Sequence, residues 1–193
     1  MNIQYNKSLL AYNTFHIDEM ASEFTVVKNE HQLFEVLRYA HEQQQEIKII
    51  GGGSNILLTQ KADCLIILNQ LKGIVIAEEN DTFTDIQFMS GENWHQCVRY
   101  CVEKNLGGIE NLSLIPGSIG AAPIQNIGAY GAELKDVFVS LTAIHTKTLQ
   151  KQQFNRTQCA FGYRDSIFKH AEHSHYFIVS VTLRLQKNPA FNT

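Results

Sequence analysis

The sequence has little of several features that mark specialised classes of protein. Its 193 residues include three prolines and one tryptophan, and its longest apolar runs, such as residues 64–68, are only strand-sized. A membrane-spanning helix needs roughly 18 consecutive apolar residues, so no membrane span is expected. The first ten residues, which include Gln4 and Lys7, lack the apolar core of a signal peptide. We therefore expect a soluble, cytoplasmic protein with no membrane partner.

Charge of one sign is also scarce. Sixteen Lys and Arg residues stand against 19 Asp and Glu residues, which gives a formal net charge of −3 without any run of five or six like charges. This balance argues against a nucleic-acid-binding protein and against a polybasic membrane-surface protein. The 44% of hydrophobic residues allows a packed core, as one large domain or two small ones. Disorder is therefore excluded as the main state.

The chain lacks the residue spacings of disulfide frameworks and zinc sites. There are four cysteines and no CxxC pair: Cys64, Cys97, Cys101 and Cys159. We expect them to be reduced thiols in the core. Three histidines, His170, His173 and His175, are close together, but their spacing fits no standard zinc pattern. We therefore expect no metal site.

Two segments show the periodicity of amphipathic helices. Asn29, followed by Gln32 and an apolar stripe, predicts a helix over about residues 30–44. A second cap-like segment, residues 90–93, precedes a stripe that predicts a helix from Trp94 to about residues 105–107.

Strand-sized runs fill much of the remaining chain. They are expected at residues 47–50, 56–59, 64–68, 74–77, 84–89, 137–144, 149–154 and 177–185. The last three are expected to form an antiparallel or mixed sheet. Turn-like residues 69–73 suggest a boundary between a smaller αβ unit, residues 1–68, and a larger α+β unit, residues 69–193.

A glycine loop with the sequence GGGSN, residues 51–55, follows the strand expected at 47–50. Glycine has no Cβ and a free φ, so consecutive amides can converge on an anion such as a phosphate. Ser54 and Asn55 add hydrogen-bonding side chains. A tight turn without a ligand fits the same residues, because the chain contains neither GxGxxG nor GxxxxGK[ST].

A second glycine-rich segment, IPGSIGAAPIQNIGAYG at residues 115–131, has four glycines, two prolines and three alanines but no charged residue. A solvated linker would be more polar, so the segment is expected to be packed. Its amides around Gly117, Ser118 and Gly120 could form a second wall facing the first loop. Two such loops suggest a phosphate-containing cofactor held between two lobes. A packing corner between sheet and helix is the alternative.

A third segment, FGYRDSIFK at residues 161–169, places Tyr163 and Arg164 among aromatic residues. A guanidinium there can bind a carboxylate in bidentate fashion or stabilise developing enolate charge, and a tyrosine hydroxyl can orient the same group. The alternative is a surface pair of Arg164 with Asp165, with Tyr163 in the core.

Together with Asn13-Thr14-Phe15, these three motifs resemble the UDP-N-acetylenolpyruvoylglucosamine reductase family in order and spacing, over about residues 13–185. The resemblance implies an α+β, two-lobed FAD-binding fold of the vanillyl-alcohol-oxidase (PCMH) type. Residues 1–68 would form the small lobe and residues 69–193 the larger one, with FAD between them. The family's C-terminal substrate-binding domain has no counterpart in these residues.

The resemblance also assigns residues to the site. The first pyrophosphate loop would be Gly51, Gly52, Gly53, Ser54, Asn55 and Ile56. The second would be Gly117, Ser118, Gly120, Ala121, Gln125, Asn126, Gly128 and Ala129. Ile178 would place backbone groups against the flavin ring. Arg164 would be the catalytic residue, with Tyr163 beside it on the substrate side.

The implied reaction uses NADPH to reduce FAD, which then reduces UDP-N-acetylglucosamine enolpyruvate to UDP-N-acetylmuramate for peptidoglycan, and so for cell shape and division. The implied partners are small molecules only, with no nucleic acid and no obligate protein partner. In the family, a third domain supplies a proton-donating serine and a late glutamate. We therefore expect these 193 residues to bind FAD without completing the cycle. A non-catalytic FAD-binding module or truncated paralogue, a small FAD-dependent alcohol oxidase and a ligand-free structural domain are the alternatives.

Overall fold

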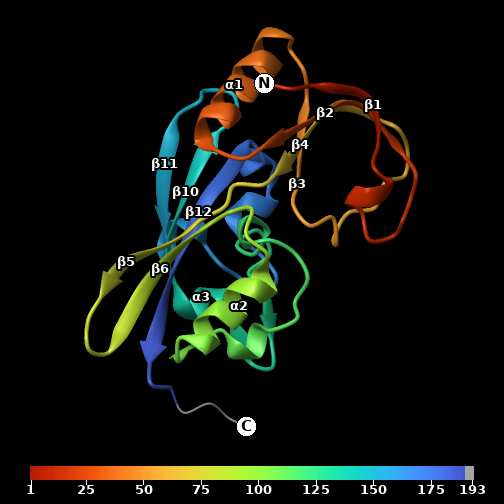
Figure 1. Cartoon of the computed structure of the whole chain (residues 1–193). Coiled ribbons are helices and arrows are strands. Elements are labelled where there is room, and N and C mark those ends of the chain that lie inside the picture. The colour runs from red at the N-terminus through yellow and green to blue at the C-terminus, as the bar shows by residue number, and fades with distance from the viewer. Residues whose placement is uncertain (190–193) are drawn as a thin grey trace.

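The computed structural model describes residues 1–189 and contains two large sheets (Figure 1). The last four residues of the larger unit expected from the sequence lie outside the described residues. The first sheet has the order β1-β2-β4-β3, in which β1 and β2 are antiparallel while β2, β4 and β3 are parallel. Its strands are β1 (Gln4–Ser8), β2 (Met20–Val27), β3 (Ile47–Ile50) and β4 (Ala62–Asn69).

The second sheet is antiparallel and has the order β11-β10-β12-β6-β5. Its strands are β5 (Ile74–Glu79), β6 (Phe83–Met89), β10 (Phe138–His145), β11 (Lys151–Asn155) and β12 (Tyr176–Lys187), and the short β7 (Leu106–Gly107) also pairs with β12. A separate two-stranded hairpin is formed by β8 (Gly128–Ala129) and β9 (Ala132–Glu133). The chain passes from the first sheet to the second at the turn-like segment, residues 70–73.

The helices are α1 (Glu30–Glu42), α2 (Trp94–Glu103), α3 (Leu134–Val137) and α4 (Arg156–Cys159). Short 3-10 turns are η1 (Leu10–Tyr12), η2 (Glu110–Leu112), η3 (Ile119–Ala121), η4 (Ile167–Lys169) and η5 (Ala171–His173). Both predicted long helices are confirmed, and each begins where an asparagine side chain accepts a hydrogen bond from a free backbone amide. Asn29 caps α1 through the Gln32 amide, and Asn93 caps α2 through the Gln96 amide.

Helix α1 joins the two sheets through a shared core. Its buried face, which includes Leu33 and Leu37, packs in one apolar cluster with Leu65 of β4 and with Phe177 and Val179 of β12. Helix α2 packs on the other side of the second sheet, where Trp94 is 1% exposed and donates its indole N–H to the Leu112 carbonyl at 2.8 Å. Buried side chains therefore fix the position of one sheet relative to the other.

The sequence-based assignment of a strand at residues 56–59 is wrong, because this segment forms no strand. Strands β3 and β4 are parallel neighbours, so the chain between them must cross back along the sheet before it can pair again. Residues 51–61 make that crossover. Strands β1 and β2 were not predicted, although β2 contains the strand-forming run Thr25-Val26-Val27.

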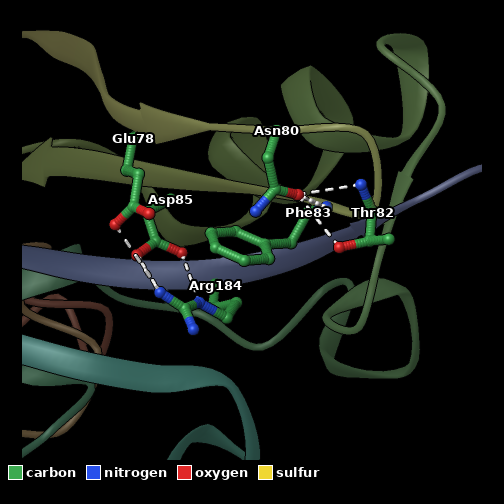
Figure 2. Close-up of polar contacts among 6 residues, drawn as sticks. All are labelled: Glu78, Asn80, Thr82, Phe83, Asp85 and Arg184. Atoms are coloured by element: carbon green, nitrogen blue, oxygen red, sulfur yellow. Dashed lines mark hydrogen bonds and ion pairs between the residues drawn. The ribbon is translucent and has the colours of Figure 1, made fainter.

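Figure 2 shows how the β5–β6 hairpin is fastened to β12. Arg184 donates from Nε and Nη2 to the two carboxylate oxygens of Asp85, at 2.8 Å each, and its guanidinium lies 3.7 Å from the centre of the Phe83 ring. The Asn80 side chain accepts from the amides of Thr82 and Phe83, which closes the turn. This arrangement is bidentate and stacked, so a lysine could not replace the arginine equivalently.

The prediction of reduced core thiols is confirmed, because all four cysteines are free and buried. Burial raises the pKa of Cys97, Cys101 and Cys159 to about 12. Across residues 1–189, no helix combines the length and apolar character that crossing a bilayer requires.

Candidate functional site

The glycine loop at residues 51–55 begins where β3 ends, and one of its glycines is required by space as well as by conformation. Gly53 has φ +68°, and a Cβ built on it would lie 2.0 Å from the Tyr12 carbonyl oxygen. The Thr14 amide donates to the Gly53 carbonyl at 3.1 Å. The loop is therefore laid directly on the backbone of residues 12–14.

The Asn13 side chain makes that support rigid. It is 5% exposed, and its Nδ2 donates to the carbonyls of Leu9 and Ile17 at 2.8 and 2.9 Å. Its Oδ1 accepts from the Ile17 amide at 3.0 Å. Asn13 thus closes the turn that carries Thr14, whose backbone amide contacts the glycine loop.

The two glycine-rich segments meet, although they are more than 60 residues apart in the sequence. A Cβ on Gly51 would lie 2.5 Å from Ser118 Oγ, and one on Gly52 would lie 3.5 Å from Gly117 Cα. Gly117 itself has φ +127°, and a Cβ there would be 3.8 Å from Ser54 Oγ. A side chain at Gly51 would therefore displace the Ser118 hydroxyl or push the two segments apart.

Backbone amides without a protein acceptor line this junction. Within residues 1–189, none of the amides of residues 51–56, and neither of the amides of Gly117 and Ser118, donates a hydrogen bond to a protein atom. Backbone N–H groups are usually paired, and a run of unpaired ones in glycine-rich turns is the arrangement that binds phosphate groups. The junction therefore offers donors to an anionic group such as a phosphate.

A cavity of about 1300 Å³ lies beside this junction, between the two sheets. Ile50 and Ile56, which flank the first glycine loop, both line the cavity. From the second sheet and its loops the wall includes Ile124, Tyr176 and Ile178. Ligand pockets usually measure about 300–1000 Å³, so this one has room for a cofactor as large as FAD.

Polar groups gather at one part of the cavity wall. Lys147 and His175 both line the cavity. The pKa of His175 is lowered by burial and by the neighbouring Lys147 and His145, so its neutral form is favoured. Cys64 also lines the cavity, and burial raises the pKa of its thiol.

Arg164 lies at the tip of a narrow turn and reaches the second glycine-rich segment. Its Nη2 donates to the Gly128 carbonyl at 2.9 Å, and its φ is +53°. Tyr163 beside it is 87% exposed, and Asp165 lies 3.1 Å from His170 Nε2. The alternative of an Arg164–Asp165 surface pair with Tyr163 in the core is therefore wrong. Neither Tyr163 nor Arg164 lines the cavity.

Several residues assigned to the second pyrophosphate loop serve the protein's own packing. A Cβ on Gly120 would lie 2.7 Å from the Ser90 Cβ, and Asn126 is fully buried. Ala121 is exposed, Gln125 is half-buried, and Ala129 lies in β8. Their contact with a cofactor stays a prediction. By contrast, Tyr12 and Ile124 were not singled out from the sequence, since only the fold brings them to the glycine loop and the cavity.

Comparison with known proteins gives the class first. A model of the FAD binding domain family matches residues 22–148, so the chain belongs to that family. The solved structure of p-cresol methylhydroxylase is similar with a TM-score of 0.64 at 15% identity, over 97% of this chain and 39% of that one. Cholesterol oxidase from Brevibacterium sterolicum is similar with a TM-score of 0.65 at 16% identity, over 96% of this chain and 38% of that one. These neighbours confirm the expected PCMH-type fold.

The more similar proteins are reductases of one kind. UDP-N-acetylenolpyruvoylglucosamine reductase of Flavobacterium johnsoniae is 46% identical over the whole chain, and that of Escherichia coli is 42% identical over 94% of it. The chain spans only 57% and 53% of these relatives' lengths. The reductase structure from Thermus caldophilus has a TM-score of 0.72 at 20% identity, over 97% of this chain and 63% of that one. The resemblance inferred from the motifs is confirmed.

Proposed function

We propose that this chain is the FAD-binding part of a UDP-N-acetylenolpyruvoylglucosamine reductase, an FAD-dependent oxidoreductase. The observation that carries the proposal is the row of unpaired amides at residues 51–56 and 117–118, together with a cavity large enough for FAD that is lined by Ile50 and Ile56 at the two ends of the first loop. The 42–46% identity to reductases of this name supports the choice of reaction.

The proposal gives the protein's residues distinct parts in holding FAD. The amides of residues 51–56 and of Gly117 and Ser118 would bind the pyrophosphate, and Ile56 and Ile178 both line the cavity with apolar surface. Bound FAD supplies the redox chemistry, because a flavin can accept a hydride from NADPH and deliver one to an enolpyruvyl double bond.

Arg164 is the residue proposed to act on the substrate. Addition of a hydride to one carbon of the enolpyruvyl group leaves negative charge next to its carboxylate until the neighbouring carbon takes a proton. A guanidinium can pair with the carboxylate and stabilise this developing charge, and the exposed Tyr163 hydroxyl can orient the same group. The product would be UDP-N-acetylmuramate for peptidoglycan, and the proposal places the reaction in the cytoplasm.

We do not propose that these 193 residues convert substrate by themselves. The chain spans just over half of its relatives' lengths, and the serine nearest Arg164 in sequence, Ser166, donates its hydroxyl to the Ile124 carbonyl at 2.7 Å. We expect the isolated chain to bind FAD but not to convert substrate. A non-catalytic FAD-binding module is the second candidate.

A chimaera separates these candidates. Residues 1–193 would replace the matching part of the Escherichia coli reductase, and NADPH oxidation would be followed with UDP-N-acetylglucosamine enolpyruvate. We expect turnover, a loss of roughly 100- to 1000-fold in Arg164→Met with FAD still bound, and partial recovery in Arg164→Lys. A chimaera that binds FAD but stays inactive would favour the non-catalytic module, and full activity of Arg164→Met would remove Arg164 from the mechanism.

A further inference from the structure

The turn that carries Tyr163 and Arg164 has only these two residues between its paired ends, Gly162 and Asp165. Gly162 and Asp165 face each other across it, with the Gly162 amide donating to the Asp165 carbonyl at 3.0 Å and the reverse bond at 3.4 Å. Arg164 adopts φ +53°, a left-handed conformation that is unfavourable for a residue with a side chain. Such a conformation persists at functional sites only where surrounding contacts enforce it.

Two buried side chains hold the base of this turn. Asn126 Nδ2 donates to the Gly162 carbonyl at 2.9 Å, and Ser166 Oγ donates to the Ile124 carbonyl at 2.7 Å. Asn126 is fully buried and Ser166 is 1% exposed. Both contacts join the turn to the second glycine-rich segment. They fix where the turn stands but do not touch Arg164.

Lys169 is the side chain that acts on Arg164 itself. The 3-10 turn η4 brings the chain back toward Arg164, and Lys169 Nζ donates to the Arg164 carbonyl at 2.9 Å. Among the described residues this amine has no other hydrogen bond and no ion pair. Lys169 is exposed, so its contact is not a by-product of core packing.

We propose that Lys169 is a positioning residue that holds Arg164 in its left-handed conformation and thereby keeps the guanidinium at the Gly128 carbonyl. Its catalytic importance rests on the proposed function, since that is what gives Arg164 a role. Without the amine, the Arg164 backbone can relax to ordinary φ, and the guanidinium loses its place beside the second glycine-rich segment. An exposed lysine that contributes one hydrogen bond would otherwise be expected to matter little.

The positioning is testable by NMR on the FAD-loaded chain, without any turnover. The guanidinium N–H signal of Arg164 would be assigned by its disappearance in Arg164→Lys, and its hydrogen exchange compared between variants. We expect Lys169→Met to speed that exchange roughly tenfold and Lys169→Arg, which keeps a donor, to restore most of the protection. Lys151→Met is the matched control, because Lys151 is an exposed lysine whose partner, Glu30, lies elsewhere.

Unchanged hydrogen exchange of the Arg164 guanidinium in Lys169→Met, or an equal change in Lys151→Met, would overturn the inference. A second readout in the chimaera tests the catalytic consequence. Lys169→Met should slow the reoxidation of reduced flavin by the enolpyruvyl substrate, while reduction by NADPH and FAD affinity stay at the parent values. If Arg164 becomes mobile but reoxidation keeps its rate, the positioning stands and the proposed role of Arg164 falls.

Discussion

Gly53 offers a sharp test of how the first glycine loop is built. In Gly53→Ala, a residue with a side chain must adopt φ +68°, which costs roughly 1–2 kcal/mol. The new Cβ would also stand 2.0 Å from the Tyr12 carbonyl oxygen, so the backbone of residues 12–14 or of the loop must shift, at a further cost of about 1–3 kcal/mol. The reduced entropy of the unfolded chain returns about 0.4–1 kcal/mol. We expect a net loss of about 2–4 kcal/mol in the free energy of unfolding.

Gly131→Ala is the matched control. Gly131 has φ +81°, but a Cβ there would have nothing within 4 Å, so only the conformational strain applies. A change of 1 kcal/mol shifts the Tm of a protein of this size by about 2–4 °C. Thermal unfolding followed by circular dichroism should therefore show a drop of about 5–15 °C for Gly53→Ala and only about 1–4 °C for Gly131→Ala. Equal Tm values in the two variants would refute the close approach of Gly53 to Tyr12.

Three further predictions follow from contacts and pKa shifts. Gly51→Ala should weaken FAD binding, because its Cβ would collide with Ser118 Oγ at 2.5 Å. Gly51→Ala with Ser118→Ala should recover affinity relative to Gly51→Ala, and Gly131→Ala, whose Cβ would have nothing within 4 Å, serves as the control in the same FAD titration. The buried, high-pKa thiols of Cys97, Cys101 and Cys159 should resist an aromatic disulfide reagent at pH 7 until the chain unfolds, and rapid labelling of these three in the native chain would contradict their burial. The lowered pKa of His175 means that the unfolded state binds more protons than the folded state. The neutral imidazole therefore contributes to the free energy of unfolding above pH ~6.5, and this contribution is lost as the pH falls through the folded-state pKa. In urea unfolding, His175→Gln should reduce the loss of stability at acid pH, and an unchanged pH profile would exclude the effect.

The parts of the fold that could be predicted from the sequence are those specified by neighbouring residues. Helices α1 and α2 each have an asparagine cap and an apolar stripe within one short segment, so both were found close to their true bounds. Strand β12 shows plain alternation and was also found. Strand β1 is mostly polar and is defined by its pairing with β2, so no local pattern reveals it.

The site shows the same division between local and long-range information. Glycine-rich loops could be recognised from composition, yet the meeting of Gly51 with Ser118 depends on the packing of two sheets. The role of Asn126 could not be predicted either, since its partner Gly162 lies 36 residues away. Residues 56–59 have a strand-like sequence but serve as a crossover, because β3 and β4 run parallel.

Titration of the purified chain with FAD, followed by quenching of flavin fluorescence, is the most direct test of the central claim. Riboflavin, which has the flavin ring but no phosphate, is the comparison ligand. The unpaired amides at residues 51–56 and 117–118 predict saturable binding of one FAD per chain and much weaker binding of riboflavin. Failure to bind FAD, or riboflavin binding as tightly as FAD, would contradict the claim that these two segments hold the pyrophosphate.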